Sequence, residues 1–270
     1  MHTTPRATDL THPVPPPQRI MRHGQRLLLT LLYLACGTAI CNATATEKVL
    51  LLTYHTHPPF VTGVKQGLTY DLAAYLTERA GHRYRFEVRE MSRPALDKSL
   101  PILQAVIVPW VNPIWFHDQA ETTYLWSTTV LMHDGMSVIS RQEKKVVYTG
   151  PASLANLTLG ALKGHVHEEI DQYIHDSQAL RRVDADQHLD NFHKLLNGRI
   201  DVTLTPESAA LYLLKREHLL ERLFLSPKPG RYARRLFVTQ QRTDLRDYID
   251  AAFSSAADQQ SWDEILRRYR

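Results

Sequence analysis

The first clear pattern in the chain is a short apolar run, Val49–Thr53, followed by a polar loop and then a helical stripe. An uninterrupted apolar run of this length is typical of a strand buried on both faces of a parallel sheet. From Leu68 to Ala80 apolar residues recur at helical spacing, and Gly81 stands where a helix commonly ends. Residues 82–90 alternate between apolar and charged, which predicts a strand with one face in water. This order predicts a right-handed β-α-β unit.

The same order of elements returns in the second half of the chain. Strands are predicted at 157–165, 180–183 and 199–205, with helices around 168–175, 188–197 and 207–220. Two successive α/β halves of about 90–100 residues predict two lobes.

The tail of the chain is too small to form a third unit. A strand, "RRLFVTQQRT", and two amphipathic helices follow, which we expect to complete the first lobe. The chain would then cross between the lobes twice, near Ser137–Arg141 and near Arg235–Gln240.

The first 45 residues carry a different pattern. Residues 21–26 are basic, Leu27–Ile40 is apolar, and Ala43-Thr44-Ala45 has small residues at the spacing of a cleavage site. Together they predict a secretory signal peptide, with translation starting at Met1 or Met21. The apolar run is shorter than the roughly 20 residues of a membrane span, and a signal anchor is the alternative.

Charge and cysteine content narrow the function. The formal net charge of +4 in 270 residues owes much to the first 45, which hold four arginines and one acid; subtracting these leaves 28 basic and 27 acidic residues. This balance argues against a nucleic-acid partner. Both cysteines, Cys36 and Cys41, also lie in the leader. A secreted chain with no cysteine of its own has no disulfide or thiol nucleophile, and fits the periplasm of a Gram-negative bacterium.

Six segments, taken in order, resemble the type II periplasmic solute-binding proteins, specifically extracellular solute-binding protein family 3. They are "LLLTYHTHPPF", "GLTYDLAAYLTERAG", "YLWSTTV", "LANLTLGALKGH", "FHKLLNGRIDVTL" and "LRDYIDAAFSSAADQQSWDEILRRY". The resemblance covers nearly all of residues 47–270. The resemblance implies an α/β fold of two sheet-and-helix lobes joined by a two-strand hinge. Lobe 1 would comprise 46–137 and 238–270, and lobe 2 would comprise 138–237.

In such a fold the ligand lies outside the carboxyl ends of the strands, in the crevice between the lobes. The loop after the first strand and the loop 106–118 should therefore line the cleft. Large aromatic faces there can stack on a flat or cationic ligand, and an amide can orient it. The alternatives are a rigid connection with surface histidines, and tryptophans that fill the lobe core. The candidate residues from these loops are Tyr54, His57, Phe60, Trp110, Asn112 and Trp115.

Lobe 2 offers candidates after two of its predicted strands. In the family, the position of "LKGH" supplies backbone N–H groups near a helix N-terminus to an anionic group of the ligand, and Lys163 or His165 could add charge there. Thr205 and Glu207 follow a later strand and would face the same cleft. A solvated turn is the alternative for the first pair.

The sequence departs from the amino-acid-binding members of the family. The family's carboxylate-clamping arginine falls at Ala120, and its amine-binding aspartate falls at about Pro206, with Glu207 adjacent. A standard α-amino acid is therefore one possible ligand among other small polar solutes.

The sequence predicts a monomeric periplasmic solute-binding protein with no cofactor, which closes on a small polar ligand and serves an ABC permease or a membrane sensor. One alternative is an enzyme resembling cyclohexadienyl dehydratase, for which Glu207 and His57 are the acid–base candidates. Another is a metal-binding protein that uses the pairs His55/His57 and His165/His167.

Overall fold

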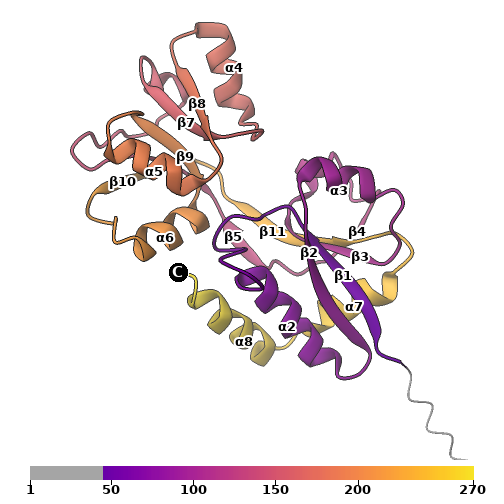
Figure 1. Ribbon diagram of the computed structural model, residues 1–270. Helices are drawn as coiled ribbons and strands as arrows, with labels where there is room; N and C mark the ends of the chain where they lie inside the picture. The colour runs from indigo at the N-terminus through magenta and orange to yellow at the C-terminus, as the bar shows by residue number, and fades with distance from the viewer. Residues whose placement is uncertain (1–44) are drawn as a thin grey trace, which may run out of the picture. The chain divides into compact units, whose positions relative to one another are not determined.

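The computed structural model describes residues 45–270, coloured in Figure 1. Residues 1–44 of the predicted leader, with both cysteines, lie outside the described residues. Within 45–270 no helix is both long enough and apolar enough to cross a membrane.

The first sheet is built mainly from the N-terminal half of the described chain, with one strand from the C-terminal part. β1, β2 and β3 run parallel, and β11 runs antiparallel to β3. In spatial order its strands are β2 (Tyr84–Glu90), β1 (Glu47–Thr53), β3 (Val106–Val111), β11 (Tyr232–Val238) and β4 (Leu125–Trp126), and β5 (Met132–Asp134) pairs with β11.

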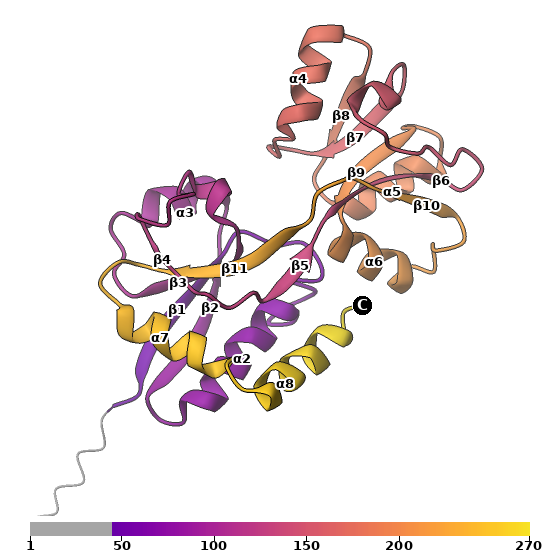
Figure 2. The ribbon, with the colours of Figure 1, turned by 180° about the vertical axis from the view of Figure 1, so that it is seen from behind.

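Helices cover both faces of this sheet, as the two views in Figure 1 and Figure 2 show. One face packs against α2 (Leu68–Ala80), α7 (Thr243–Ala252) and α8 (Ala256–Arg267). The other packs against α3 (Arg93–Ser99) and the short helix η1 (Pro113–Phe116). The C-terminal helices thus share the core of the first lobe.

The second sheet repeats the arrangement with its own core. Its strands, in spatial order, are β10 (Leu223–Pro227), β6 (Met136–Arg141), β9 (Val202–Pro206), β7 (Thr158–Leu162) and β8 (Arg181–Ala185). One face packs against α5 (His188–Leu196) and α6 (Glu207–Arg216), and the other against α4 (Glu168–Ser177) and η2 (Pro151–Leu154). The predicted fold class, two mixed α/β lobes, is confirmed.

The chain crosses between the two sheets a few residues earlier than the sequence predicts. β5 belongs to the first sheet and β6 to the second, so the first crossing is at Gly135. The return lies between Pro227 and Tyr232, because β11 pairs with β3 and β5 of the first sheet. Residues 232–237, predicted in lobe 2, therefore belong to the first sheet.

The loop that follows β1 is fixed to the start of α2 by backbone hydrogen bonds. The amide groups of Leu68 and Thr69 donate to the carbonyls of Pro59 and Phe60, at 2.9 and 3.0 Å. Gly67 makes this close approach possible: its φ is +117°, and a Cβ there would lie 2.6 Å from the carbonyl oxygen of Phe60. Only glycine adopts such a conformation readily.

We expect Gly67→Ala to lower the free energy of unfolding by about 3 kcal/mol, because it adds a forbidden backbone conformation to a clash with main-chain atoms. Gly150→Ala is the matched control: its φ of 135° and ψ of 169° are close to the 117° and 173° of Gly67, but nothing lies within 4 Å of the added Cβ, so only the conformational loss of about 1–2 kcal/mol should remain. Urea denaturation of both variants measures the difference. Equal losses would show that the contact with Phe60 is not what requires glycine.

Candidate ligand-binding site

The carboxyl ends of the parallel strands in the two sheets meet where the lobes adjoin. On the lobe 1 side, the loop after β1 brings His57 to this seam; on the lobe 2 side, α5 begins with His188 directly after β8. Their imidazole rings lie 5.2 Å apart, nearly perpendicular to each other. The predicted position of the cleft therefore contains a direct contact between the lobes.

This seam is rich in histidine. His55 and His57 of lobe 1 have ring centroids 5.8 Å apart. His55 and His188 are buried, with 8% and 3% of their surface exposed. Nε2 of His55, Nε2 of His57 and both ring nitrogens of His188 are buried and find no hydrogen-bond partner among residues 45–270. Buried polar atoms without a hydrogen-bond partner are rare in folded proteins, and each one needs an explanation, such as a ligand that binds to it.

Burial makes these imidazoles neutral at pH 7. It lowers the pKa of His188 to about 3, and repulsion from His165 and His167, where they are protonated, acts in the same direction. For His55 and His57 burial again comes first, and Arg234 adds its positive charge, so that the pKa of each ring is well below its usual 6.5. A neutral imidazole both donates and accepts a hydrogen bond, so the seam can serve a ligand with either kind of group.

The buried histidines should make stability depend on pH. In the unfolded chain they titrate near pH 6.5. The folded protein holds their pKa values lower, so below about pH 6.5 the unfolded state binds more protons and stability falls as the pH falls. Each histidine that stays neutral should cost about 2 kcal/mol at about pH 5. Urea unfolding at several pH values measures this loss; a flat profile down to about pH 5 would contradict it, and His188→Gln should reduce the slope.

A buried ion pair lies next to this cluster, at the crossing between the lobes. Nε of Arg234 donates to Oδ2 of Asp134 at 2.8 Å, and the two side chains are 2% and 1% exposed. The arginine also donates to the carbonyl of Trp110 and to the Tyr232 hydroxyl. Its guanidinium lies 5.3 Å from the ring centroid of Trp115. Its charge is thus compensated within the protein.

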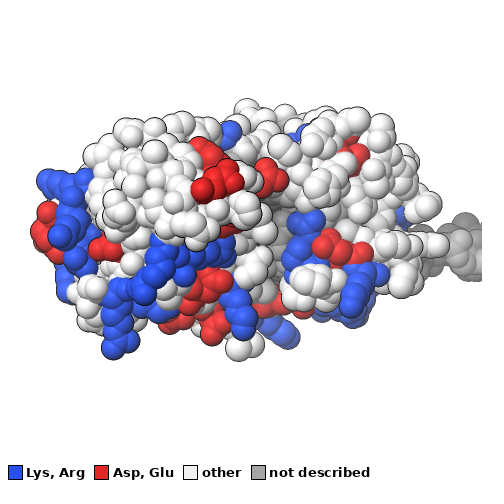
Figure 3. All heavy atoms as spheres, turned by 90° about the horizontal axis from the view of Figure 1, so that it is seen from above, with Lys and Arg blue, Asp and Glu red and all other residues white. Residues whose placement is uncertain are grey.

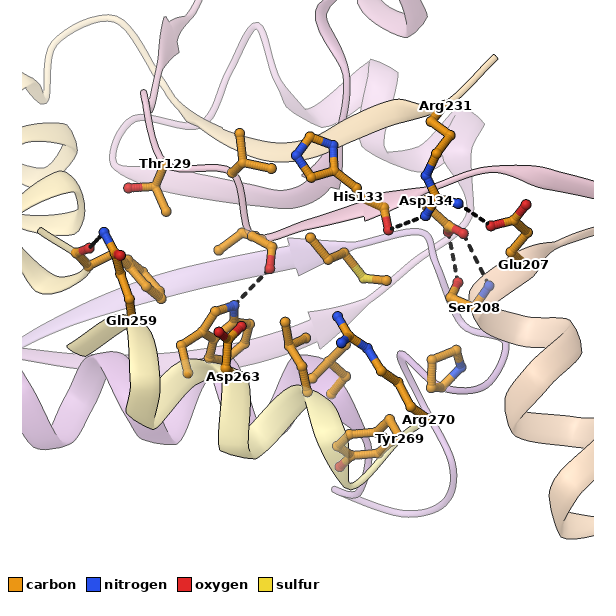
Figure 4. Close-up of a pocket in the computed structure, with 18 of the residues that line it drawn as sticks. Thr129, His133, Asp134, Glu207, Ser208, Arg231, Gln259, Asp263, Tyr269 and Arg270 are labelled. Atoms are coloured by element: carbon orange, nitrogen blue, oxygen red, sulfur yellow. Dashed lines mark hydrogen bonds and ion pairs between the residues drawn. The ribbon is translucent and has the colours of Figure 1, made fainter. Parts of the chain in front are cut away.

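Asp134 also connects lobe 1 to the start of α6 in lobe 2. Its carboxylate accepts hydrogen bonds from the backbone N–H and the hydroxyl of Ser208, at 3.1 and 2.7 Å. Beside it, Arg231 donates to Glu207 at 2.7 Å, and Figure 4 shows both interactions across the junction. These contacts link the lobes through the hinge region.

The structure places the predicted lobe 1 residues at different depths. Phe60 and Trp110 have no exposed surface and belong to the core, where the Trp110 indole donates to the Thr69 hydroxyl. Asn112 caps η1 and donates to the carbonyl of Ala233, so its amide is already bonded. Trp115, half-buried, packs edge-on against Tyr232.

Tyr54 is half-buried beside the cluster, with its ring 4.1 Å from that of His55. The guanidinium of Arg93 lies 5.2 Å from the Tyr54 ring on its other side. Of the lobe 1 candidates, His57 is the one in direct contact with lobe 2.

The predicted lobe 2 residues also differ in burial and in hydrogen bonding. Lys163 and His165 are exposed in the turn after β7. Thr205 is fully buried with its hydroxyl unpartnered, whereas the carboxylate of Glu207 is committed to Arg231. His57 and Glu207, the acid–base candidates of the enzyme hypothesis, line different cavities.

Two cavities flank the junction of the lobes. One, of about 570 Å³, is lined from both lobes and includes His57, Thr62, Asp186, His188 and Arg216. It opens on the histidine seam, so we take it as the entrance to the candidate site.

The other cavity, of about 780 Å³, lies along α8 and β5 and reaches the start of α6. Figure 4 shows Gln259 and Asp263 of α8 and the C-terminal Arg270 on one side of it, with Glu207 and Ser208 beyond. It is larger, but none of the unpartnered polar atoms of the seam belongs to its lining residues.

Three residues of the site were missed by the sequence reasoning: His188, Asp134 and Arg234. His188 had a usable signal, because it stands at the start of a predicted helix a few residues after a predicted strand, close to the carboxyl end of that strand. For the metal hypothesis, residues 45–270 contain no group of three or more His, Cys, Asp or Glu arranged to hold a metal ion.

The fold is shared with solved structures of binding proteins. An amino acid ABC transporter substrate-binding protein, AbpA from Streptococcus pneumoniae, bound to L-arginine, matches with a TM-score of 0.62 at 15% identity over 82% of this chain and 94% of that one. The periplasmic VFT2 domain of BvgS from Bordetella pertussis matches with 0.57 at 18% identity over 83% and 93%.

A reconstructed protein matches equally well. AncCDT-1, an ancestral amino acid-binding protein described as a precursor of cyclohexadienyl dehydratase, has a TM-score of 0.63 at 13% identity over 82% of this chain and 95% of that one. No family model and no curated protein sequence matches the chain. The likeness therefore establishes the fold, the type II periplasmic binding-protein fold.

Proposed function

We propose that this protein is a periplasmic solute-binding protein of extracellular solute-binding protein family 3, which captures a small polar ligand at the histidine seam between its lobes. The observation that carries the proposal is the set of unpartnered polar atoms contributed by both lobes: Nε2 of His55, Nε2 of His57 and both ring nitrogens of His188. A ligand that bonds to them would bridge the lobes.

The energetics of these atoms explain how a ligand would favour closure. A buried polar group without a partner costs about 1–3 kcal/mol. A ligand that supplies the missing partners removes this cost only when the lobes are together, so it shifts the open–closed equilibrium toward the closed form. The crossings at Gly135 and at 228–231 are the short segments about which the lobes would move.

The leader and the fold support a place outside the cytoplasm. The predicted signal peptide would export the chain, and the solved structures of this fold include an ABC transporter substrate-binding protein and a periplasmic domain of BvgS. We therefore propose delivery of the ligand either to an ABC permease or to a membrane sensor.

The enzyme alternative receives less support from the site. Its two candidate groups do not line the same cavity, and the carboxylate of Glu207 is held by Arg231 at 2.7 Å. A general acid–base pair would need both groups within reach of one substrate. Turnover of a prephenate-like substrate would restore this alternative.

A thermal-shift screen over amino acids, polyamines, opines and small carboxylates tests the proposal. A ligand at about 100 times its dissociation constant should add about 2.7 kcal/mol of stability, which raises the melting temperature by roughly 5 °C. His188→Phe and His57→Phe should abolish the shift, because each removes unpartnered ring nitrogens of the seam. His175→Phe, at an exposed position of α4, is the matched control and should keep it. A ligand whose shift survives in all three variants would place the binding site elsewhere.

A further inference from the structure

The charged groups around the seam are already paired, which limits the ligands that it can accept. On the hinge side, Asp134 is bonded to Arg234 and Glu207 to Arg231. Arg93, which lies beside Tyr54, is paired with Asp97 at 2.8 Å. On the hinge side and the lobe 1 wall, the carboxylates of Asp134, Glu207 and Asp97 are therefore each paired with an arginine.

The lobe 2 wall is balanced in the same way. Arg182 bonds to both Asp171 and Asp184, at 2.6 and 2.8 Å, and also donates to the carbonyl of His165. Lys228 pairs with Glu169 at 2.7 Å. The carboxylates that face His165 and His167 are thus held by cations.

The charges nearest the entrance lie at its rim. Asp186 is exposed, and Arg216 and Glu217 lie 3.6 Å from each other at the same cavity. These groups face water, where a single charge pair contributes little. Figure 3 shows acidic and basic side chains interspersed on one face of the molecule, rather than gathered in one large area of a single sign.

We propose that the seam binds a small anion that carries no ammonium group, such as a hydroxy or keto carboxylate, and that its histidines take up protons as the anion enters. This inference rests on the proposed function and specifies its ligand class. An ammonium group buried in the seam would need a buried carboxylate partner. Asp134, Asp171 and Asp184 are already bonded to arginine. Asp186, which has no such partner among residues 45–270, lies at the exposed rim. A carboxylate, by contrast, meets imidazoles that can become cations.

The proton makes the binding of the anion energetically possible. A buried charge is tolerated only when it is paired and hydrogen-bonded. A proton from the solvent that binds to His57 or His188 turns the neutral ring into an imidazolium, and the imidazolium donates a charge-assisted hydrogen bond to the carboxylate. The anion and the proton enter together, and the seam remains neutral overall.

Isothermal titration calorimetry in PIPES and in Tris buffer, which differ in heat of ionisation, measures this coupling, with pyruvate, lactate and succinate as anionic probes and alanine, arginine and putrescine as amines. We expect a carboxylate probe to bind with uptake of on the order of one proton, seen as a binding heat that differs between the buffers. Its dissociation constant should fall about tenfold for each pH unit of acidification per proton taken up.

His188→Gln should weaken binding of the carboxylate and reduce the proton uptake, while His175→Gln should change neither. Binding of amines in preference to carboxylates, or a carboxylate heat that does not depend on the buffer, would overturn the anion inference and leave the solute-binding proposal standing. Binding of neither class, together with no hit in the wider thermal screen, would overturn both.

Discussion

Replacing Asp134 with alanine is expected to lower the free energy of unfolding by about 3–5 kcal/mol, because it leaves Arg234 buried and unpaired. The arginine is 2% exposed and cannot reach water without a rearrangement of the hinge. The same change removes the acceptor for Ser208 at the start of α6, which adds about 1 kcal/mol. Urea denaturation of the purified variant measures the sum.

A double variant separates the two contributions. In Asp134→Leu/Arg234→Met neither charge remains, so most of the lost free energy of unfolding should be recovered. About 1 kcal/mol of the loss should persist, because Ser208 at the start of α6 still lacks its acceptor. A loss below about 1 kcal/mol in Asp134→Ala alone would show that the pair is far more hydrated than its burial indicates.

Replacing Trp262 with alanine, in a different part of lobe 1, should lower the free energy of unfolding by about 3–5 kcal/mol. The side chain is 4% exposed, its indole donates to the carbonyl of Leu131 at 2.7 Å, and its ring packs edge-on against Tyr75 and Phe253. The substitution therefore creates a cavity and leaves a buried carbonyl without its donor.

Glu264→Ala, at an exposed position on the same helix, is the matched control and should change stability by less than about 0.5 kcal/mol. If the two variants unfold at the same urea concentration, the C-terminal helix is not part of the lobe 1 core. Near-complete unfolding of Trp262→Ala would instead support the observed packing of Trp262, because the expected loss of about 3–5 kcal/mol approaches the total free energy of unfolding of many domains.

The regular elements could be predicted because their patterns are local. The apolar run that became β1 and the helical stripe of α2 need no knowledge of the rest of the chain. The predicted hinge differs from the observed one by a few residues, because the local pattern does not show which sheet a strand joins. β11 pairs with β3 of the first sheet, and this pairing is between residues far apart in the sequence.

The site was harder to predict because it is made by segments far apart in the sequence: the loop after β1, the start of α5, and strands β5 and β11. Each His-x-His pair is visible in the sequence, but the contact between His57 and His188 joins residues of different lobes. Asp134 and Arg234, which form the ion pair, are 100 positions apart in the sequence. A basic residue in a predicted strand is normally interpreted as facing water, so the sequence does not indicate that Arg234 is buried. Large aromatics mark a core as readily as a binding site, and Phe60 and Trp110 lie in the core.

The central claim, that a ligand at the seam draws the two lobes together, can be tested with one distance. Residues 46–270 contain no cysteine, so spin labels on Lys98→Cys in α3 and Gln172→Cys in α4 would be specific once Cys36 and Cys41 are replaced by serine. Both positions are exposed. With a ligand found by calorimetry, we expect pulsed electron–electron resonance to show a larger fraction of short distances between the labels. A distance distribution that stays unchanged when this ligand saturates the protein would contradict the account.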